Sequence, residues 1–117
     1  MNPGRYNITV YQGTTFTLSP SWLIDNVVVD VTGYSAKVQV RPEADSSTVV
    51  VELSTANNRI AVNGALGQFN WVLTDTETAA ASLPAGNYVY DFNVTSGGGI
   101  VTKLLQGAFI VVDSVTA

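Results

Sequence analysis

The stretch Tyr34-Ser35-Ala36-Lys37-Val38-Gln39-Val40-Arg41 decides the fold class of this chain. Its apolar residues alternate with polar and charged residues, and successive side chains of a β-strand point to opposite faces. One face is therefore apolar and the other is wet, which is typical of an antiparallel sheet with one side on the core. Pro42 ends the strand because proline cannot donate a hydrogen bond to a sheet neighbour.

The same alternation recurs along the chain, interrupted by turn residues at short intervals. We expect further strands at residues 6–10, 16–18, 48–53, 59–62, 69–73, 88–94, 100–105 and 108–112. The aromatic stripe in residues 88–94 predicts a central strand. Asn57-Asn58 and Gly97-Gly98-Gly99 are expected to close hairpins, and Gly107 to mark a bulge or a turn.

One segment departs from the strand pattern. Thr74-Asp75-Thr76-Glu77 has the spacing of a capping box, and alanine-rich sequence follows it. We therefore expect one short helical turn near residues 75–83. The whole chain, residues 1–117, is predicted to be a single antiparallel, immunoglobulin-like β-sandwich of about eight strands. Its predicted core contains Val38, Val40, Trp71, Tyr90, Phe92 and Phe109.

Composition supports an all-β domain and excludes several classes of function. In 117 residues, 47 are Val, Ile, Thr, Tyr, Phe or Trp, against 25 that favour helices (Ala, Leu, Met, Glu and Lys). There is no cysteine and no histidine, so thiolate chemistry, histidine-ligated metal and histidine-based triads are excluded. A net charge of −4 argues against nucleic acid as a partner. No stretch is apolar enough to predict a membrane span.

The charged residues are unusually few. They make up 12% of the chain, about half the share in ordinary soluble domains. Either uncharged polar residues (Ser, Thr, Asn and Gln) keep the chain soluble, or a partner covers part of its surface. We favour the second possibility, because a weakly charged surface is poorly protected against association.

The sequence holds no convincing catalytic or cofactor site. Three carboxylate pairs are present: Asp25 with Asp30, Glu43 with Asp45, and Asp75 with Glu77. Each pair lies in a predicted turn or cap, where acidic residues make local hydrogen bonds. Asp25, Asn26 and Asp30 offer too few oxygen ligands for calcium. We therefore predict a protein that is not an enzyme and has no cofactor or metal.

The alternative is a carbohydrate-binding β-sandwich module. Trp22, Trp71 or Tyr11 would form its platform if these aromatic rings were exposed. Both tryptophans are in phase with apolar neighbours, which favours core packing instead. Exposed aromatic rings beside a groove would support the carbohydrate-binding module, and buried tryptophans would support a scaffold.

Several blocks of sequence occur in a succession that resembles a known family. They are Gly13–Phe16, Trp22, Asp30–Arg41, Asn58–Ile60, Leu83–Asp91 and Leu104–Gly107. This succession is similar to small β-sandwich domains of virion structural proteins in tailed bacteriophages, and the likeness covers roughly residues 6–112. The resemblance implies a structural role in the phage particle, as a capsid-decorating cement subunit or as a tail or baseplate adaptor. It also implies other virion proteins as partners, many copies or a homo-oligomer in each particle, and localisation in the virion.

The chain departs from the family pattern between Trp22 and Asp30. In place of a polar, glycine-containing hairpin it has Leu23-Ile24-Asp25-Asn26-Val27-Val28-Val29. Three consecutive valines must place apolar groups on both faces of a strand. We therefore predict an assembly interface here, and its residues are Leu23, Ile24, Val27, Val28 and Val29.

Overall fold

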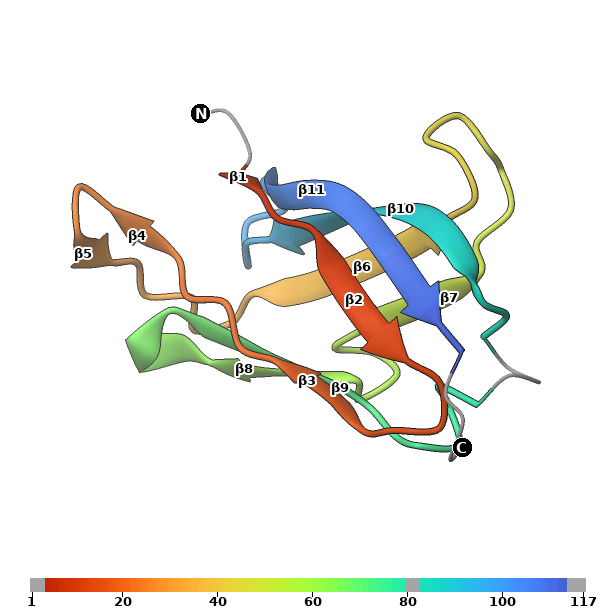
Figure 1. Cartoon of the computed structure of the whole chain (residues 1–117). Helices are drawn as coiled ribbons and strands as arrows, with labels where there is room; N and C mark the ends of the chain where they lie inside the picture. The colour runs from red at the N-terminus through yellow and green to blue at the C-terminus, as the bar shows by residue number, and fades with distance from the viewer. Residues whose placement is uncertain (1–3, 80–82, 114–117) are drawn as a thin grey trace.

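The computed structural model describes residues 4–79 and 83–113, and they form two packed layers of β-sheet (Figure 1). The larger sheet has six strands: β1 (Gly4–Arg5), β2 (Ile8–Tyr11), β6 (Ser35–Arg41), β7 (Val51–Ser54), β10 (Gly86–Thr95) and β11 (Val101–Val112). The smaller sheet has three: β3 (Phe16–Leu18), β8 (Ile60–Asn63) and β9 (Gln68–Leu73). A separate two-stranded ribbon contains β4 (Leu23–Ile24) and β5 (Val27–Val28), and a 3₁₀ turn, η1 (Gly64–Leu66), joins β8 to β9.

The predicted all-β sandwich is confirmed. Among the described residues eleven strands are present, and eight of them have three or more residues, against about eight predicted. The two ranges expected at 100–105 and 108–112 form one continuous strand, β11. The expected central position of the aromatic strand is also correct. β10 pairs antiparallel with β11 on one side and with β6 on the other.

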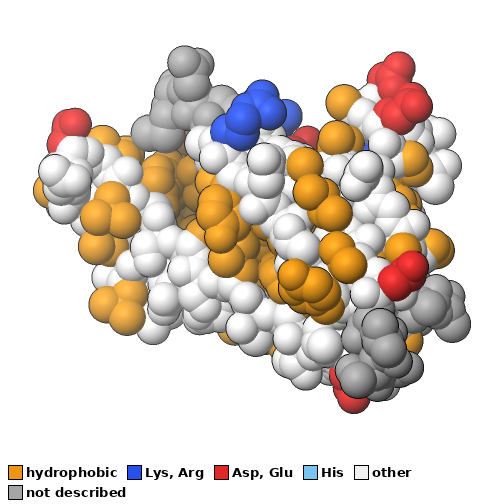
Figure 2. Space-filling model, viewed as in Figure 1, with side chains coloured by type: hydrophobic (Ala, Val, Ile, Leu, Met, Phe, Trp, Pro, Cys, Tyr) orange, Lys and Arg blue, Asp and Glu red, His pale blue; other side chains and the backbone are white. Residues whose placement is uncertain are grey.

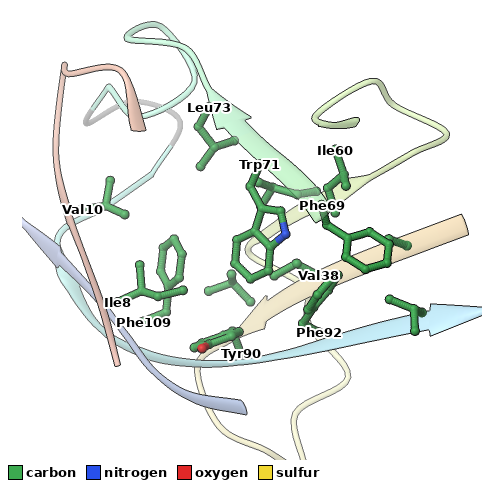
Figure 3. Packing of buried hydrophobic residues seen from close by; sticks show 14 of the residues in the cluster. Ile8, Val10, Val38, Ile60, Phe69, Trp71, Leu73, Tyr90, Phe92 and Phe109 are labelled. Carbon is green, nitrogen blue, oxygen red and sulfur yellow. The ribbon is translucent and has the colours of Figure 1, made fainter. Parts of the chain in front are cut away.

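The core lies between the two sheets and is built from the inward-facing residues of each (Figure 3). Trp71, from β9, packs edge-to-face on Tyr90 and Phe92, from β10, with ring centroids 6.2 and 4.9 Å apart. Phe69 meets Phe92 in the same way at 5.3 Å. All six predicted core residues are at most 3% exposed, so that prediction is confirmed.

We expected a purely antiparallel sandwich, and this detail is wrong, because the larger sheet also contains parallel pairs. β1 and β2 both run parallel to β11, in the register Gly4↔Leu105 and Phe109↔Ile8. Both fit beside β11 because its Gly107 has no side chain. A Cβ at this position would lie 2.4 Å from the carbonyl oxygen of Tyr6. Gly107 is thus a site of close backbone approach inside a continuous strand, and the predicted turn there is wrong.

The bulge lies elsewhere in β11. The register with β10 shifts between Phe92↔Leu105 and Asn93↔Lys103, which leaves Leu104 as the additional residue. The hairpin expected at Gly97–Gly99 is confirmed, and Gly99 has a φ of 91°. The hairpin expected at Asn57-Asn58 is wrong, because β7 belongs to the larger sheet and β8 to the smaller one.

The chain crosses from the larger to the smaller sheet at Asn57, and this crossing lets the residues on both sides of it reach the core. Leu53 and Ile60 are both buried, and each faces the core from its own layer. The Asn57 side chain accepts hydrogen bonds from the backbone N–H groups of Ser54 and Arg59, at 2.9 and 3.1 Å. Local hydrogen bonding of this kind is common for asparagine in turns.

The capping box is formed. The backbone N–H of Thr74 donates to Glu77 Oε1 at 2.8 Å, and that of Glu77 donates to Thr74 Oγ1 at 3.2 Å. One helical turn follows, closed by a hydrogen bond from Thr78 N–H to the Thr74 carbonyl at 3.0 Å. No regular helix is assigned within residues 74–79. The rest of the predicted helical segment includes residues 80–82, which lie outside the described residues.

We expect Trp71→Ala to destabilise the fold by about 3–5 kcal/mol, because the side chain bridges the two sheets and would leave a cavity. Val72→Ala is the control, since its side chain is 39% exposed in the same strand. Urea unfolding measures both free energies of unfolding. Equal, small effects of the two substitutions would contradict the assigned core.

Stability should also fall at alkaline pH. Burial raises the pKa of Tyr90 to about 12, from an ordinary value of 10.0. The unfolded chain therefore loses this proton first, so stability decreases as pH rises from about 10 to 12, by at most about 1.4 kcal/mol for each pH unit. Urea titrations at several pH values should show this slope in the wild type and in Tyr11→Phe. A slope of the same size in Tyr90→Phe would show that Tyr90 is not its source.

Candidate assembly surface

The β4–β5 hairpin projects from the end of the sandwich (Figure 1). Leu23 pairs with Val28 and Ile24 with Val27, and the two strands share no ladder with either main sheet. The turn between them is Asp25-Asn26, with φ values of 52° and 64°. Two central residues with positive φ are typical of a type I′ turn, which aspartate and asparagine tolerate.

The hairpin is apolar on both faces. The directly paired side chains of Leu23 and Val28 share one face, and those of Ile24 and Val27 share the other. These four side chains are 44–66% exposed. Figure 2 shows hydrophobic side chains gathered on the projecting hairpin at the left of the view. A ribbon of two strands is marginal in stability by itself, so an uncovered hairpin of this kind is a surface available for contact.

The base of the hairpin is fixed to the smaller sheet. The backbone N–H of Trp22 donates to the Gly67 carbonyl at 2.8 Å, and that of Val29 donates to the Trp22 carbonyl at 2.9 Å. Val29 is only partly exposed and packs against the core, and Val31 is fully buried. Four of the five predicted interface residues are therefore exposed, and Val29 belongs to the attachment.

Sequence reasoning missed a second feature, on the outer face of the larger sheet. Four of the five cations of the chain lie on this face: Arg5, Lys37, Arg41 and Lys103. A hollow of about 640 Å³ opens between three of them, Arg5, Arg41 and Lys103. We call it the basic hollow. Val89 and Ala108, neighbours in the sheet register, form an apolar part of its floor.

The polar groups of the basic hollow are held by a network across the strands. Arg41 donates to Gln39 Oε1 at 2.6 Å and to the Ser46 carbonyl at 2.7 Å. Lys103 Nζ lies 3.5 Å from Asp91 Oδ2, with both side chains substantially exposed. No side-chain hydrogen bond or ion pair of Arg5 is found within residues 4–79 and 83–113. The hollow therefore combines cations with one carboxylate that can accept a hydrogen bond.

The acidic residues singled out from the sequence are not brought together into a site. Asp25 is at the tip of the hairpin, whereas Asp30 is at its base. Hydrogen bonds from the hydroxyl and backbone N–H of Thr32 lower the pKa of Asp30. The Thr74 backbone N–H lowers the pKa of Glu77, which also pairs with Arg59 Nε at 2.6 Å. Asp30 and Glu77 therefore have structural partners.

The three aromatic residues of the carbohydrate-binding alternative are dispersed. Trp71 is 1% exposed and lies in the core. Trp22 is partly buried, packs edge-to-face on Tyr34 at 6.1 Å, and has a buried Nε1 with no hydrogen-bond partner within the described residues. Tyr11 is 55% exposed. Of the three, Trp71 cannot be part of a surface platform.

Two further findings concern only residues 4–79 and 83–113. No three residues of metal-binding type gather at one place in this part of the chain. No helix in it has the length and apolarity needed to cross a membrane.

The sequence matches no protein-family model and no curated protein. Conclusions about function therefore depend on the residues and their geometry, together with the resemblance described above.

The attachment of the hairpin depends on Gly67, whose φ is +59° and whose added Cβ would lie 2.4 Å from the Val29 carbonyl oxygen. Gly33 is a matched control, with a φ of +82° and open space around it. Gly33→Ala should cost about 1–2 kcal/mol from backbone strain alone. Gly67→Ala should cost about 1–3 kcal/mol more, because the hairpin base must also move. Chemical denaturation measures the difference, and equal costs would mean that the two segments do not pack closely.

Proposed function

We propose that this protein is a non-catalytic structural subunit of a tailed-phage particle and that the β4–β5 hairpin contacts another protein of the particle. The observation that carries the proposal is the exposure of four apolar side chains on both faces of a projecting hairpin. Contiguous exposed apolar groups usually mark interaction sites. Covering them removes apolar surface from water, which favours association.

The low charge of the chain supports the same proposal. Only 12% of its residues are charged, so few charges oppose close contact with a neighbouring subunit. The hairpin turn is also preorganised, because Asp25 and Asn26 already have the left-handed backbone conformation of a tight turn. Binding through a preorganised segment loses less conformational entropy than binding through a flexible one.

The proposal places the protein in the virion, with other virion proteins as partners and several copies in each particle. A capsid-decorating cement subunit and a tail or baseplate adaptor are the two positions that the sequence resemblance implies. Co-sedimentation of the purified chain with separated phage heads and with separated tails distinguishes them. Binding to heads indicates a cement subunit, and binding to tails indicates an adaptor.

Val28→Asp should leave folding intact and reduce incorporation into particles at least about tenfold, because it places a charge in a contact that must be desolvated. The matched control is Val72→Asp, at another strand valine of similar exposure, 39% against 44% for Val28. Quantitative blotting of purified particles measures incorporation, and circular dichroism checks the fold. Normal incorporation of folded Val28→Asp, together with Val27→Asp, would place the contact elsewhere and refute the role of the hairpin.

A further inference from the structure

We infer that the partner of the β4–β5 hairpin is a second copy of this chain, and that the Asp25-Asn26 tip of one copy docks into the basic hollow of another. This inference rests on the proposed function, since it takes the hairpin to be an assembly element, and it names the partner and the receiving site. It joins two features that lie in different parts of the sandwich: an acid-tipped apolar hairpin and a basic hollow with a partly apolar floor.

Charge is divided unevenly over the molecule. The outer face of the larger sheet carries four cations and two carboxylates, Glu52 and Asp91. Since the chain has five cations and nine carboxylates in all, one cation and seven carboxylates are left for the rest. The face is thus positive on a negative molecule. An acidic segment of another copy is attracted to it, and this attraction sets orientation as well as contact rate.

The chemistry of the tip matches that of the hollow. Asp25 offers a carboxylate, which the guanidinium groups of Arg5 and Arg41 can bind with charge-assisted hydrogen bonds. Asn26 offers an amide donor, which suits the carboxylate of Asp91. An anion alone would meet repulsion from Asp91. A carboxylate with a neighbouring amide therefore fits the site better than a simple anion does.

The apolar parts also correspond. Ile24 and Val27 flank the tip on one face of the hairpin, and Val89 and Ala108 form the apolar floor of the hollow. The volume of about 640 Å³ is in the range that accommodates a compact group of atoms such as one turn. The backbone of the larger sheet is already paired in its ladders at this place, so recognition depends on side chains and not on an added strand.

Such a contact joins unlike surfaces of two copies. A contact of this type forms rings where the rotation closes and open chains where it does not. Either product supplies several copies of the subunit at one place in a particle.

Sedimentation velocity of the purified full chain tests the inference. We expect concentration-dependent self-association, and Asp25→Lys or Arg5→Glu should each weaken it about tenfold by placing like charges together. The double variant Asp25→Lys with Arg5→Glu should restore association to within about threefold of wild type, because the charges are exchanged and the attraction returns. Asp25→Asn removes the charge and retains a residue that tolerates the turn, so it should weaken association without affecting the fold.

Two control substitutions change the net charge by the same amounts as Arg5→Glu and Asp25→Lys. Lys37→Glu alters a cation on the same face that does not line the hollow, and Asp113→Lys alters an exposed carboxylate that follows β11. Both should associate like wild type. The inference is overturned if the chain stays monomeric at about 1 mM, a concentration that would detect even weak binding. Failure of the double variant to recover, or equal weakening by the controls, would overturn it as well.

Failure of this inference is distinct from failure of the proposed function. A monomeric chain whose Val28→Asp variant is lost from particles retains the particle role and overturns the contact between copies. Self-association with the expected charge exchange, combined with normal incorporation of the Val28→Asp and Val27→Asp variants, retains the contact between copies and overturns the role of the hairpin in incorporation into the particle.

Discussion

The contact of Trp71 with Tyr90 and Phe92 is the interaction on which the rest of the structure depends. It joins the central strands of the two sheets, with all three rings at most 3% exposed. Aromatic rings bury much apolar area each and prefer edge-to-face geometry, so this contact sets the spacing and orientation of the layers. Once β9 is fixed on β10, Gly67, the residue just before β9, and the Trp22 backbone bound to it fix the base of the hairpin. The apolar surface of the hairpin is thereby held away from the core.

Sequence alone predicted the parts of the fold that depend on local alternation. Residues 35–41 and 88–94 have one buried face each, and both are strands in the larger sheet. The sequence could not predict the parts of the fold that depend on which strands become neighbours. Asn57-Asn58 has the composition of a hairpin turn but crosses between sheets, because Leu53 and Ile60 must both reach the core. Gly107 resembles a turn signal, but its function is to let the Tyr6 backbone approach β11.

The candidate surface was predictable to a similar degree. Three consecutive valines require apolar groups on both faces of a strand, and this identified the hairpin without a structure. The pattern could not show that Val29 would turn back to the core, because that depends on the hydrogen bond from its backbone N–H to the Trp22 carbonyl. The basic hollow could not be predicted from the sequence. Arg5, Arg41 and Lys103 are far apart in the sequence and meet only because β1, β6 and β11 share one sheet. The alternation of Lys37, Gln39 and Arg41 on a wet face was the only local signal.

The central claim is that the β4–β5 hairpin is exposed in the free chain and covered in the assembled particle. Amide hydrogen exchange of residues 23–28, compared between the purified chain and intact particles, tests this claim most directly. The hairpin lacks sheet neighbours, so its amides should exchange rapidly in the free chain and be strongly protected in the particle. Rapid exchange of residues 23–28 in both states, with protection gained at other segments, would contradict the account.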